Sequence, residues 1–148
     1  MKIIHRLQAT SAPTAVLIIR LMVGAVFLSE GIQKFLYPGD VGAGRFAKIG
    51  LPSPEALAPF VASFEIGCGA LVILGLLTRV AVVPLIVVMC FALYTTKLPI
   101  LVNSGFFKMA HEARTDFSML LGSIFLLIVG SGPWSMDFSC QRKSSPHA

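Results

Sequence analysis

The chain has 148 residues, of which 55% are hydrophobic and 13% charged, and its mean hydropathy is +0.82. Charged residues make up about 25% of a typical soluble domain, so a soluble protein of this composition would lack a polar surface. The net charge of +5 is spread over the termini and loops without a block of basic residues, which excludes a nucleic-acid-binding arm and leaves a single membrane domain over residues 1–148.

The first predicted span covers residues 14–36. It begins after Pro13 and ends at Tyr37-Pro38-Gly39-Asp40, so both ends carry residues that break helices. The apolar run from Ala15 to Leu36 is too long for the hydrophobic region of a secretory signal and is interrupted by Arg20. We therefore expect a retained membrane span rather than a cleaved signal.

A predicted loop over residues 37–54 leads to the second span, residues 55–77. The loop has mixed polarity and has room for a short interfacial helix at residues 41–49. Only the turn Leu76-Leu77-Thr78-Arg79 separates the second span from the third, residues 80–97. Such a short connection requires the second and third spans to be antiparallel neighbours.

The stretch over residues 98–115 is the most polar and aromatic part of the chain, and it is predicted to be a loop. The fourth span covers residues 116–131. A tail over residues 132–148 follows, in which Trp134 suits the headgroup region. The sequence thus predicts an all-α protein, an integral membrane four-helix bundle with both termini on one side.

The orientation of this bundle follows from its basic residues only in part. Lysine and arginine near the span ends are equally numerous on the two sides. The first span often dominates insertion, and its basic flank, with Lys2 and Arg6, is N-terminal. We therefore expect a multi-pass membrane protein with cytoplasmic termini.

Four ionisable residues lie inside the first two predicted spans: Arg20, Glu30, Lys34 and Glu65. A charged side chain at the bilayer centre costs roughly 2.5–3.5 kcal/mol even on the lenient insertion scale, so such residues normally face a bundle interior, a partner or a water-filled cavity. Arg20 and Lys34 fall on one helical stripe, and Glu30 lies one turn before Lys34, close enough to pair with it. These four residues are the candidate ligand-binding site.

Two other readings remain open for these charges. Glu30, Lys34 and Glu65 could form a buried polar cluster that only fixes helix packing. A basic residue of the first span would then be the counter-ion of Glu65. Glu65 could instead lie high enough to meet headgroup water, which would leave no buried ion. Gly24 and Gly31 lie on the same stripe and would let a neighbouring helix approach closely.

A second polar cluster occupies the predicted loop and the start of the fourth span: Lys108, His111, Glu112, Arg114 and Asp116. A charged loop at a membrane surface is usually only solvated. The alternative is that this cluster binds an anionic or quinone-like molecule.

Metal and haem sites are not expected. Intramembrane haem usually needs histidines on facing helices, whereas two of the three histidines are terminal and His111 lies in a predicted loop. Cys68 and Cys90 fall within spans and Cys140 in the tail, and no two form a C-x-x-C motif, so a dithiol redox site is not expected either. The only cofactor that we consider is a mobile quinone.

Several short motifs follow one another along the chain: Arg20-Leu21-Met22-Val23-Gly24, Glu30-Gly31-Ile32-Gln33-Lys34-Phe35, Glu65, Gly75-Leu76-Leu77-Thr78-Arg79 and Gly132-Pro133-Trp134-Ser135-Met136-Asp137. In this order, over residues 15–137, the chain resembles the DoxX family of small four-span bacterial and archaeal membrane proteins. The last motif departs from the family's Gly-Pro-Gly…Ser-Leu-Asp in its second glycine. The positions that match the family pattern are Arg20, Gly24, Gly31, Lys34, Glu65, Arg79 and Asp137, and the resemblance attaches no catalytic role to them.

The resemblance implies a four-helix membrane bundle. For some relatives it implies a subunit role in thiosulfate:quinone oxidoreductase, or in a membrane complex that handles thiols and oxidative stress. We therefore expect a membrane subunit of a redox system, linked to quinone or to thiol and sulfur chemistry, that binds a small hydrophobic molecule between its first two spans. Lys34 and Arg20 would polarise a quinone carbonyl, and Glu65 or Glu30 would exchange the proton that accompanies reduction.

The expected partners are membrane lipid, a redox protein that carries the chemistry and a second copy of the chain, with no nucleic acid. Whether the chain itself is an enzyme stays open, because it is at most an oxidoreductase subunit whose cofactor is a quinone or belongs to its partner. The alternative function is that of a non-enzymatic membrane assembly or binding protein, in which the buried charges only fix packing.

Overall fold

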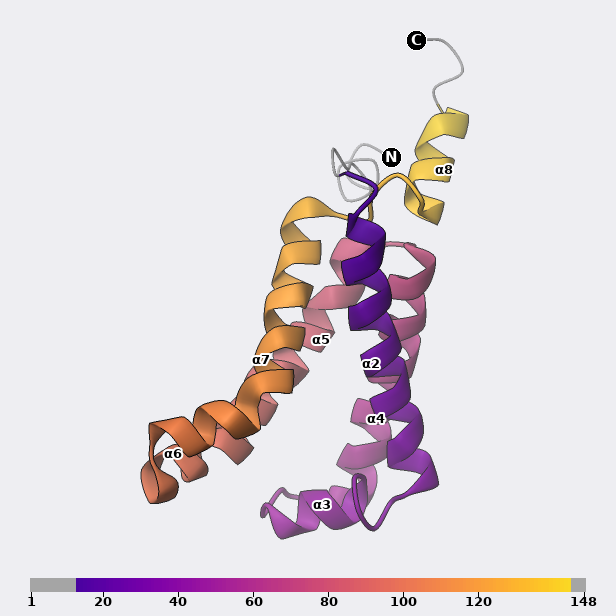
Figure 1. The fold of residues 1–148 in the computed structure, drawn as a ribbon. Coiled ribbons are helices and arrows are strands. Elements are labelled where there is room, and N and C mark those ends of the chain that lie inside the picture. The colour runs from indigo at the N-terminus through magenta and orange to yellow at the C-terminus, as the bar shows by residue number, and fades with distance from the viewer. Residues whose placement is uncertain (1–12, 145–148) are drawn as a thin grey trace.

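The computed structural model describes residues 13–144, and all regular structure in this part of the chain is helical (Figure 1). Its elements are α2 (Val16–Leu36), α3 (Ala43–Lys48), α4 (Pro54–Leu74), α5 (Thr78–Ala92), the π-helix η1 (Leu93–Lys97), α6 (Leu98–Ser104), α7 (Phe106–Val129) and α8 (Met136–Ser144). The prediction of an all-α protein is confirmed. Lys2 and Arg6, on which the predicted orientation depends, lie outside the described residues.

Both α2 and α4 begin and end close to where the sequence predicts, and a proline and a glycine set the ends of α4. Pro54 is the first residue of α4, where its missing N–H has no helical partner to lose. Gly75 ends α4 in a left-handed conformation with φ 68°, so this helix ends at Leu74 rather than at residue 77. The short turn that follows makes α4 and α5 packed antiparallel neighbours, as predicted.

The predicted loop over residues 98–115 is wrong, because this stretch forms α6 and the first part of α7, with a reversal at Gly105. Pro99 suggests a break, but it lies in the first turn of α6, where a missing N–H costs little. The π-helix η1 immediately precedes it. In η1, the hydroxyl groups of Thr95 and Thr96 each donate a hydrogen bond to the backbone carbonyl oxygen four residues earlier. These carbonyl oxygens therefore have hydrogen-bond partners.

Three helical segments of the described residues are long and apolar enough to cross a membrane. They are Val16–Leu36, Pro54–Leu74 and the continuous run Thr78–Ser104, which joins α5, η1 and α6. The helix α7 has 24 residues, but its first half carries the charges of the second polar cluster. Its apolar part, residues 117–129, is about 20 Å long at about 1.5 Å per residue, shorter than a hydrocarbon core of about 30 Å. The structure therefore shows three candidate spans where the sequence predicts four.

The long helices form two pairs, α2 with α4 and α5 with α7. Figure 1 shows the pairs close together at the end where α8 lies and far apart at the other end, where α3 and α6 lie. The end near α8 is the closed end of the bundle. It is filled by buried apolar side chains, among them Val23, Val72, Leu85 and Leu126. The packing is therefore tight at one end and leaves an opening at the other.

Glycines bring the backbones of α2 and α4 into direct contact. A Cβ atom added to Gly31 would lie 2.8 Å from the carbonyl oxygen of Ala62, and one added to Gly24 would lie 2.9 Å from that of Gly69. A Cβ added to Gly69 would lie 2.9 Å from the backbone nitrogen of Leu28. These distances are shorter than real Cβ contacts, so a side chain at any of these positions would push the helices apart. The prediction that Gly24 and Gly31 admit a close neighbour is confirmed.

Replacing Gly69 with alanine is expected to lower the free energy of unfolding by about 1–3 kcal/mol, because the added methyl group meets only backbone atoms of α2. Gly67, two residues earlier on an exposed face of α4, provides the control, since an added Cβ there meets nothing within 4 Å. Gly67→Ala should leave stability unchanged or raise it by up to about 1 kcal/mol through helix propensity. Thermal unfolding of both variants in detergent tests the contrast, and equal effects would contradict the close packing.

Candidate functional site

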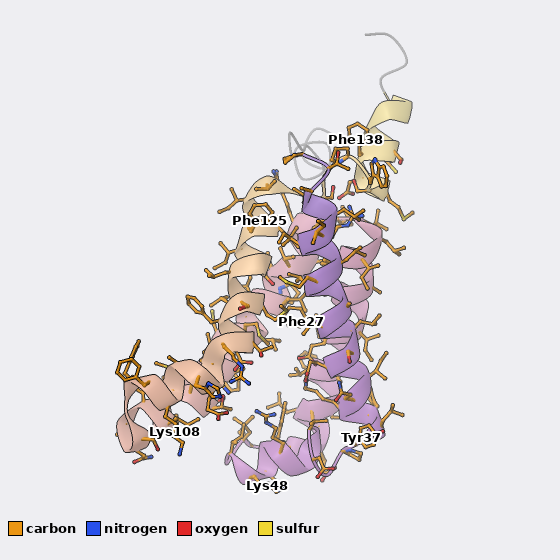
Figure 2. The ribbon with its side chains drawn as sticks, viewed as in Figure 1. Phe27, Tyr37, Lys48, Lys108, Phe125 and Phe138 are labelled. Atoms are coloured by element: carbon orange, nitrogen blue, oxygen red, sulfur yellow. The ribbon has the colours of Figure 1, made fainter. Side chains whose placement is uncertain are left out.

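A cavity of about 610 Å³ lies between the two helix pairs where they diverge. Side chains of α2, α3 and α4 line one side of it, and side chains of α5, η1 and α7 line the other. Phe27, Phe60 and Phe91 contribute to its apolar walls, and Figure 2 shows Phe27 where the two pairs separate. The volume lies within the range of small-molecule sites, about 300–1,000 Å³.

A buried ion pair forms part of the cavity wall. The Nζ atom of Lys34 lies 2.6 Å from Oε2 of Glu65, and the two side chains are 10% and 2% exposed. The same Nζ atom lies 3.9 Å from Oε2 of Glu30, whose side chain is 49% exposed. One ammonium group thus lies between two carboxylates, one withdrawn from solvent and one accessible.

The close packing of α2 and α4 positions this pair. Gly31 lies one turn before Lys34, and a Cβ atom added to it would be 3.0 Å from Cβ of Glu65. Because Gly31 has no side chain, Glu65 can approach α2 closely and Lys34 can reach its carboxylate. The reading in which Glu65 reaches headgroup water is wrong for this structure, since its side chain is buried against Lys34.

A second ion pair lies on the other wall. Nζ of Lys97 lies 3.1 Å from Oδ2 of Asp116, with side chains 12% and 26% exposed, and both residues line the cavity. Lys97 is the last residue of η1, which also contributes Thr95 and Thr96 to the wall. Sequence analysis places Lys97 only at the end of a span and does not select it, because a lysine there is typical of an interfacial anchor.

The two predicted clusters meet in this one cavity. Glu30, Lys34 and Glu65 line it from α2 and α4, and Glu112 and Asp116 line it from α7. The sequence predicts a ligand site between the first two spans. The cavity does not lie there, because the backbones of these two helices touch each other.

The remaining members of the second cluster lie outside the cavity lining. Lys108, His111 and Arg114 are exposed on α7, and Arg114 Nη1 donates to the carbonyl oxygen of His111 at 2.7 Å. Figure 2 shows Lys108 near the end of α7 that adjoins α6. No group of three or more histidine, cysteine, aspartate or glutamate side chains within residues 13–140 has the arrangement of a metal site.

Arg20 lies far from the cavity, at the closed end of the bundle. It is 3% exposed, and it donates from Nη1 to the carbonyl oxygen of Ser131 at 2.6 Å and from Nη2 to that of Trp134 at 2.5 Å. It precedes Lys34 by fourteen residues, about 21 Å along a helix at about 1.5 Å per residue. Arg20 therefore holds the segment after α7 against α2 and does not belong to the site, contrary to the sequence prediction.

The last motif of the chain completes this closed end. Asp137 accepts hydrogen bonds from the backbone N–H groups of Leu77 at 2.9 Å and Thr78 at 3.3 Å, and its own N–H donates to the carbonyl oxygen of Gly75 at 3.0 Å. Its carboxylate thereby caps the first turn of α5, where the helix dipole favours negative charge. The motifs around residues 20, 75 and 137 thus meet in one structural cluster.

Helices long and apolar enough to cross a bilayer, with an ion-paired cavity among them, define an α-helical membrane protein. The DoxX family model matches residues 15–98, which include Lys34, Glu65 and Lys97 and end before α7. The chain belongs to the DoxX family.

Two relatives support this membership. "Uncharacterized membrane protein Rv3486" of Mycobacterium tuberculosis (strain ATCC 25618 / H37Rv) is 51% identical over 146 residues, which cover 95% of this chain and 90% of that protein. "Putative oxidoreductase CatD" of Bacillus subtilis (strain 168) is 34% identical over 124 residues, which cover 82% of this chain and 83% of that protein. No solved structure matches the chain.

Proposed function

We propose that the protein binds a quinone, or a related small hydrophobic molecule, in the cavity between its two helix pairs. In this proposal it is the membrane subunit of a redox system, linked to quinone or to thiol and sulfur chemistry, and a partner protein carries the remaining chemistry. The relative named as an oxidoreductase supports a redox role.

The observation that carries the proposal is the buried Lys34–Glu65 pair on the wall of an apolar cavity. A lysine ammonium group has three N–H donors, and a carbonyl oxygen of the ligand can accept one of them while Glu65 keeps another. Glu30 lies beside the same ammonium group with half of its side chain exposed, so it can exchange a proton with water. The site thus combines a donor for a carbonyl oxygen with carboxylates that can supply or accept the accompanying proton.

The proposal also includes a four-span topology in the bacterial inner membrane, with one domain over the chain and cytoplasmic termini. The helix α7 would be the fourth span, because Glu112 and Asp116 face the cavity and need not face lipid. The first half of α7 would then lie where the cavity opens towards the membrane surface. A second copy of the chain or a redox protein would bind elsewhere on the lipid-facing surface.

One observation favours the alternative function, that of an assembly or binding protein without redox chemistry. The lysines of the cavity are already paired with carboxylates of the same chain. Such pairs can fix helix packing without any ligand.

A double variant separates the two functions. Lys34→Met/Glu65→Met removes both partners, so no buried charge is left unpaired and the stability should stay close to that of the unaltered protein. Binding of decylubiquinone to the purified protein in lipid nanodiscs, measured by titration calorimetry, should weaken at least about tenfold, as expected for a lost hydrogen bond to a charged group. Lys48→Met provides the control, because Lys48 is exposed on α3 and does not line the cavity.

Unchanged decylubiquinone affinity in the double variant would contradict the proposed site. Absence of binding by the unaltered protein would favour the assembly function instead.

A further inference from the structure

Two ion pairs face one cavity from opposite walls. Lys34 and Glu65 belong to α2 and α4, whereas Lys97 and Asp116 belong to η1 and α7. The two lysine side chains are similarly withdrawn from solvent, at 10% and 12% exposure, and both line the cavity. The cavity therefore offers an ammonium group on each side of the space that a ligand would occupy.

The pairing of both lysines argues for an uncharged ligand. Each ammonium group already has a carboxylate within 2.6 or 3.1 Å, so an anionic ligand would compete with that carboxylate, and a cationic ligand would be repelled by the lysine. A carbonyl or hydroxyl oxygen can instead accept one of the remaining N–H groups without displacing the carboxylate. The other charged side chains of the lining, Glu30, Arg45 and Glu112, are exposed and of both signs, so water and salt screen the field that they create.

The walls between the pairs suit a flat ring. The lining includes Phe27, Phe46, Phe60 and Phe91, and aromatic side chains pack well against rings in stacked or edge-to-face arrangements.

The π-helix η1 provides an independent indication of a ligand site. Such segments are rare and occur frequently at functional sites, where the wider turn redirects side chains. Here η1 contributes Thr95, Thr96 and Lys97 to the cavity lining.

We propose that the ligand is an uncharged ring molecule with polar oxygens at two opposite edges, one accepting a hydrogen bond from Lys34 and the other from Lys97. Lys97 is then a ligand-contacting residue, and Asp116 is a positioning residue that holds it at the wall. This inference rests on the proposed function and adds the second contact and the ligand geometry to it. A 1,4-quinone has this geometry, whereas a ring ketone with one carbonyl group lacks it.

Two probes with the same fused bicyclic skeleton test the second contact. 2,3-Dimethyl-1,4-naphthoquinone has two carbonyl groups and a fully substituted quinone ring, which disfavours addition of cysteine thiols. 2,3-Dimethyl-1-tetralone has one carbonyl group. Titration calorimetry of the full chain in nanodiscs should show about tenfold tighter binding of the quinone, and Lys97→Met should remove this advantage while changing tetralone affinity less than twofold.

Further variants exclude a general loss of folding. Lys97→Arg keeps both the donor and the pairing with Asp116, so it should retain most of the preference for the quinone. Lys97→Met/Asp116→Met leaves no unpaired carboxylate and should match Lys97→Met in binding. Lys108→Met, on an exposed part of α7, should bind both probes as the unaltered protein does.

Equal affinities of the unaltered protein for the two probes, with binding still dependent on Lys34, would overturn the two-contact geometry and leave the proposed function standing. An equal loss for both probes in Lys97→Met would also overturn it, since Lys97 would then act through packing alone. If the unaltered protein binds neither probe, both the proposed function and this inference fail.

Discussion

Replacing Lys34 alone with methionine is expected to lower the free energy of unfolding by about 3–5 kcal/mol, the usual effect of removing one partner from a buried ion pair. The side chain of Glu65 is 2% exposed, and its carboxylate has Lys34 Nζ at 2.6 Å. Without that ammonium group the carboxylate must stay charged without its counter-ion, take up a proton or draw α4 away from α2. Unfolding of the purified protein in mild detergent, titrated with sodium dodecyl sulfate, measures the loss.

The second substitution at Glu65 should restore most of this stability, because Lys34→Met/Glu65→Met leaves neither charge of the pair buried without its partner. Lys48→Met should unfold as the unaltered protein does, since Lys48 is exposed on α3. If Lys34→Met were as stable as Lys48→Met, Glu65 would have access to water, and the cavity would be open enough to solvate a carboxylate. The stability of Lys34→Met thus tests whether Glu65 is buried. The ligand affinity of Lys34→Met/Glu65→Met tests the proposed function.

The positions of α2 and α4 are predictable because hydropathy and helix-breaking residues agree there. Both helices begin and end within a few residues of the predicted spans. The segment over residues 98–115 is not predictable in this way, because Pro99, Gly105 and the charges that follow are typical of a loop, although the chain is helical there. Glu112 and Asp116 line the cavity rather than facing lipid, so this part of α7 is helical without being apolar.

The candidate site is predictable in part, because a charge within an apolar span needs a polar surrounding. This argument correctly brings Glu30, Lys34 and Glu65 together. It fails for Arg20, since a helical stripe gives the direction of a side chain but does not tell whether a cavity exists at its level. It also fails for Lys97, whose pairing with Asp116 depends on the reversal between α6 and α7.

Replacing Arg20 with methionine is expected to lower the free energy of unfolding by about 3–6 kcal/mol, since it removes two hydrogen bonds from a charged donor at about 1.5–3 kcal/mol each. The carbonyl oxygens of Ser131 and Trp134 lose these donors at the closed end of the bundle. The segment that carries Asp137, the cap of α5, should then detach from α2 more readily. Hydrogen exchange of backbone amides at residues 131–137 should increase together with the loss of stability.

Arg114→Met provides the matched control, because Arg114 is exposed on α7 and donates to a carbonyl oxygen of the same helix. It should change neither stability nor exchange at residues 131–137. Quinone affinity of the folded Arg20→Met protein should equal that of the unaltered protein, because Arg20 lies about 21 Å along α2 from Lys34 at about 1.5 Å per residue. A loss of quinone affinity without a change in stability would instead make Arg20 a ligand residue, as its position on the stripe suggests. Arg20 thus separates the two roles that a buried charge can have in this bundle: holding the closed end together and contacting a ligand at the open end.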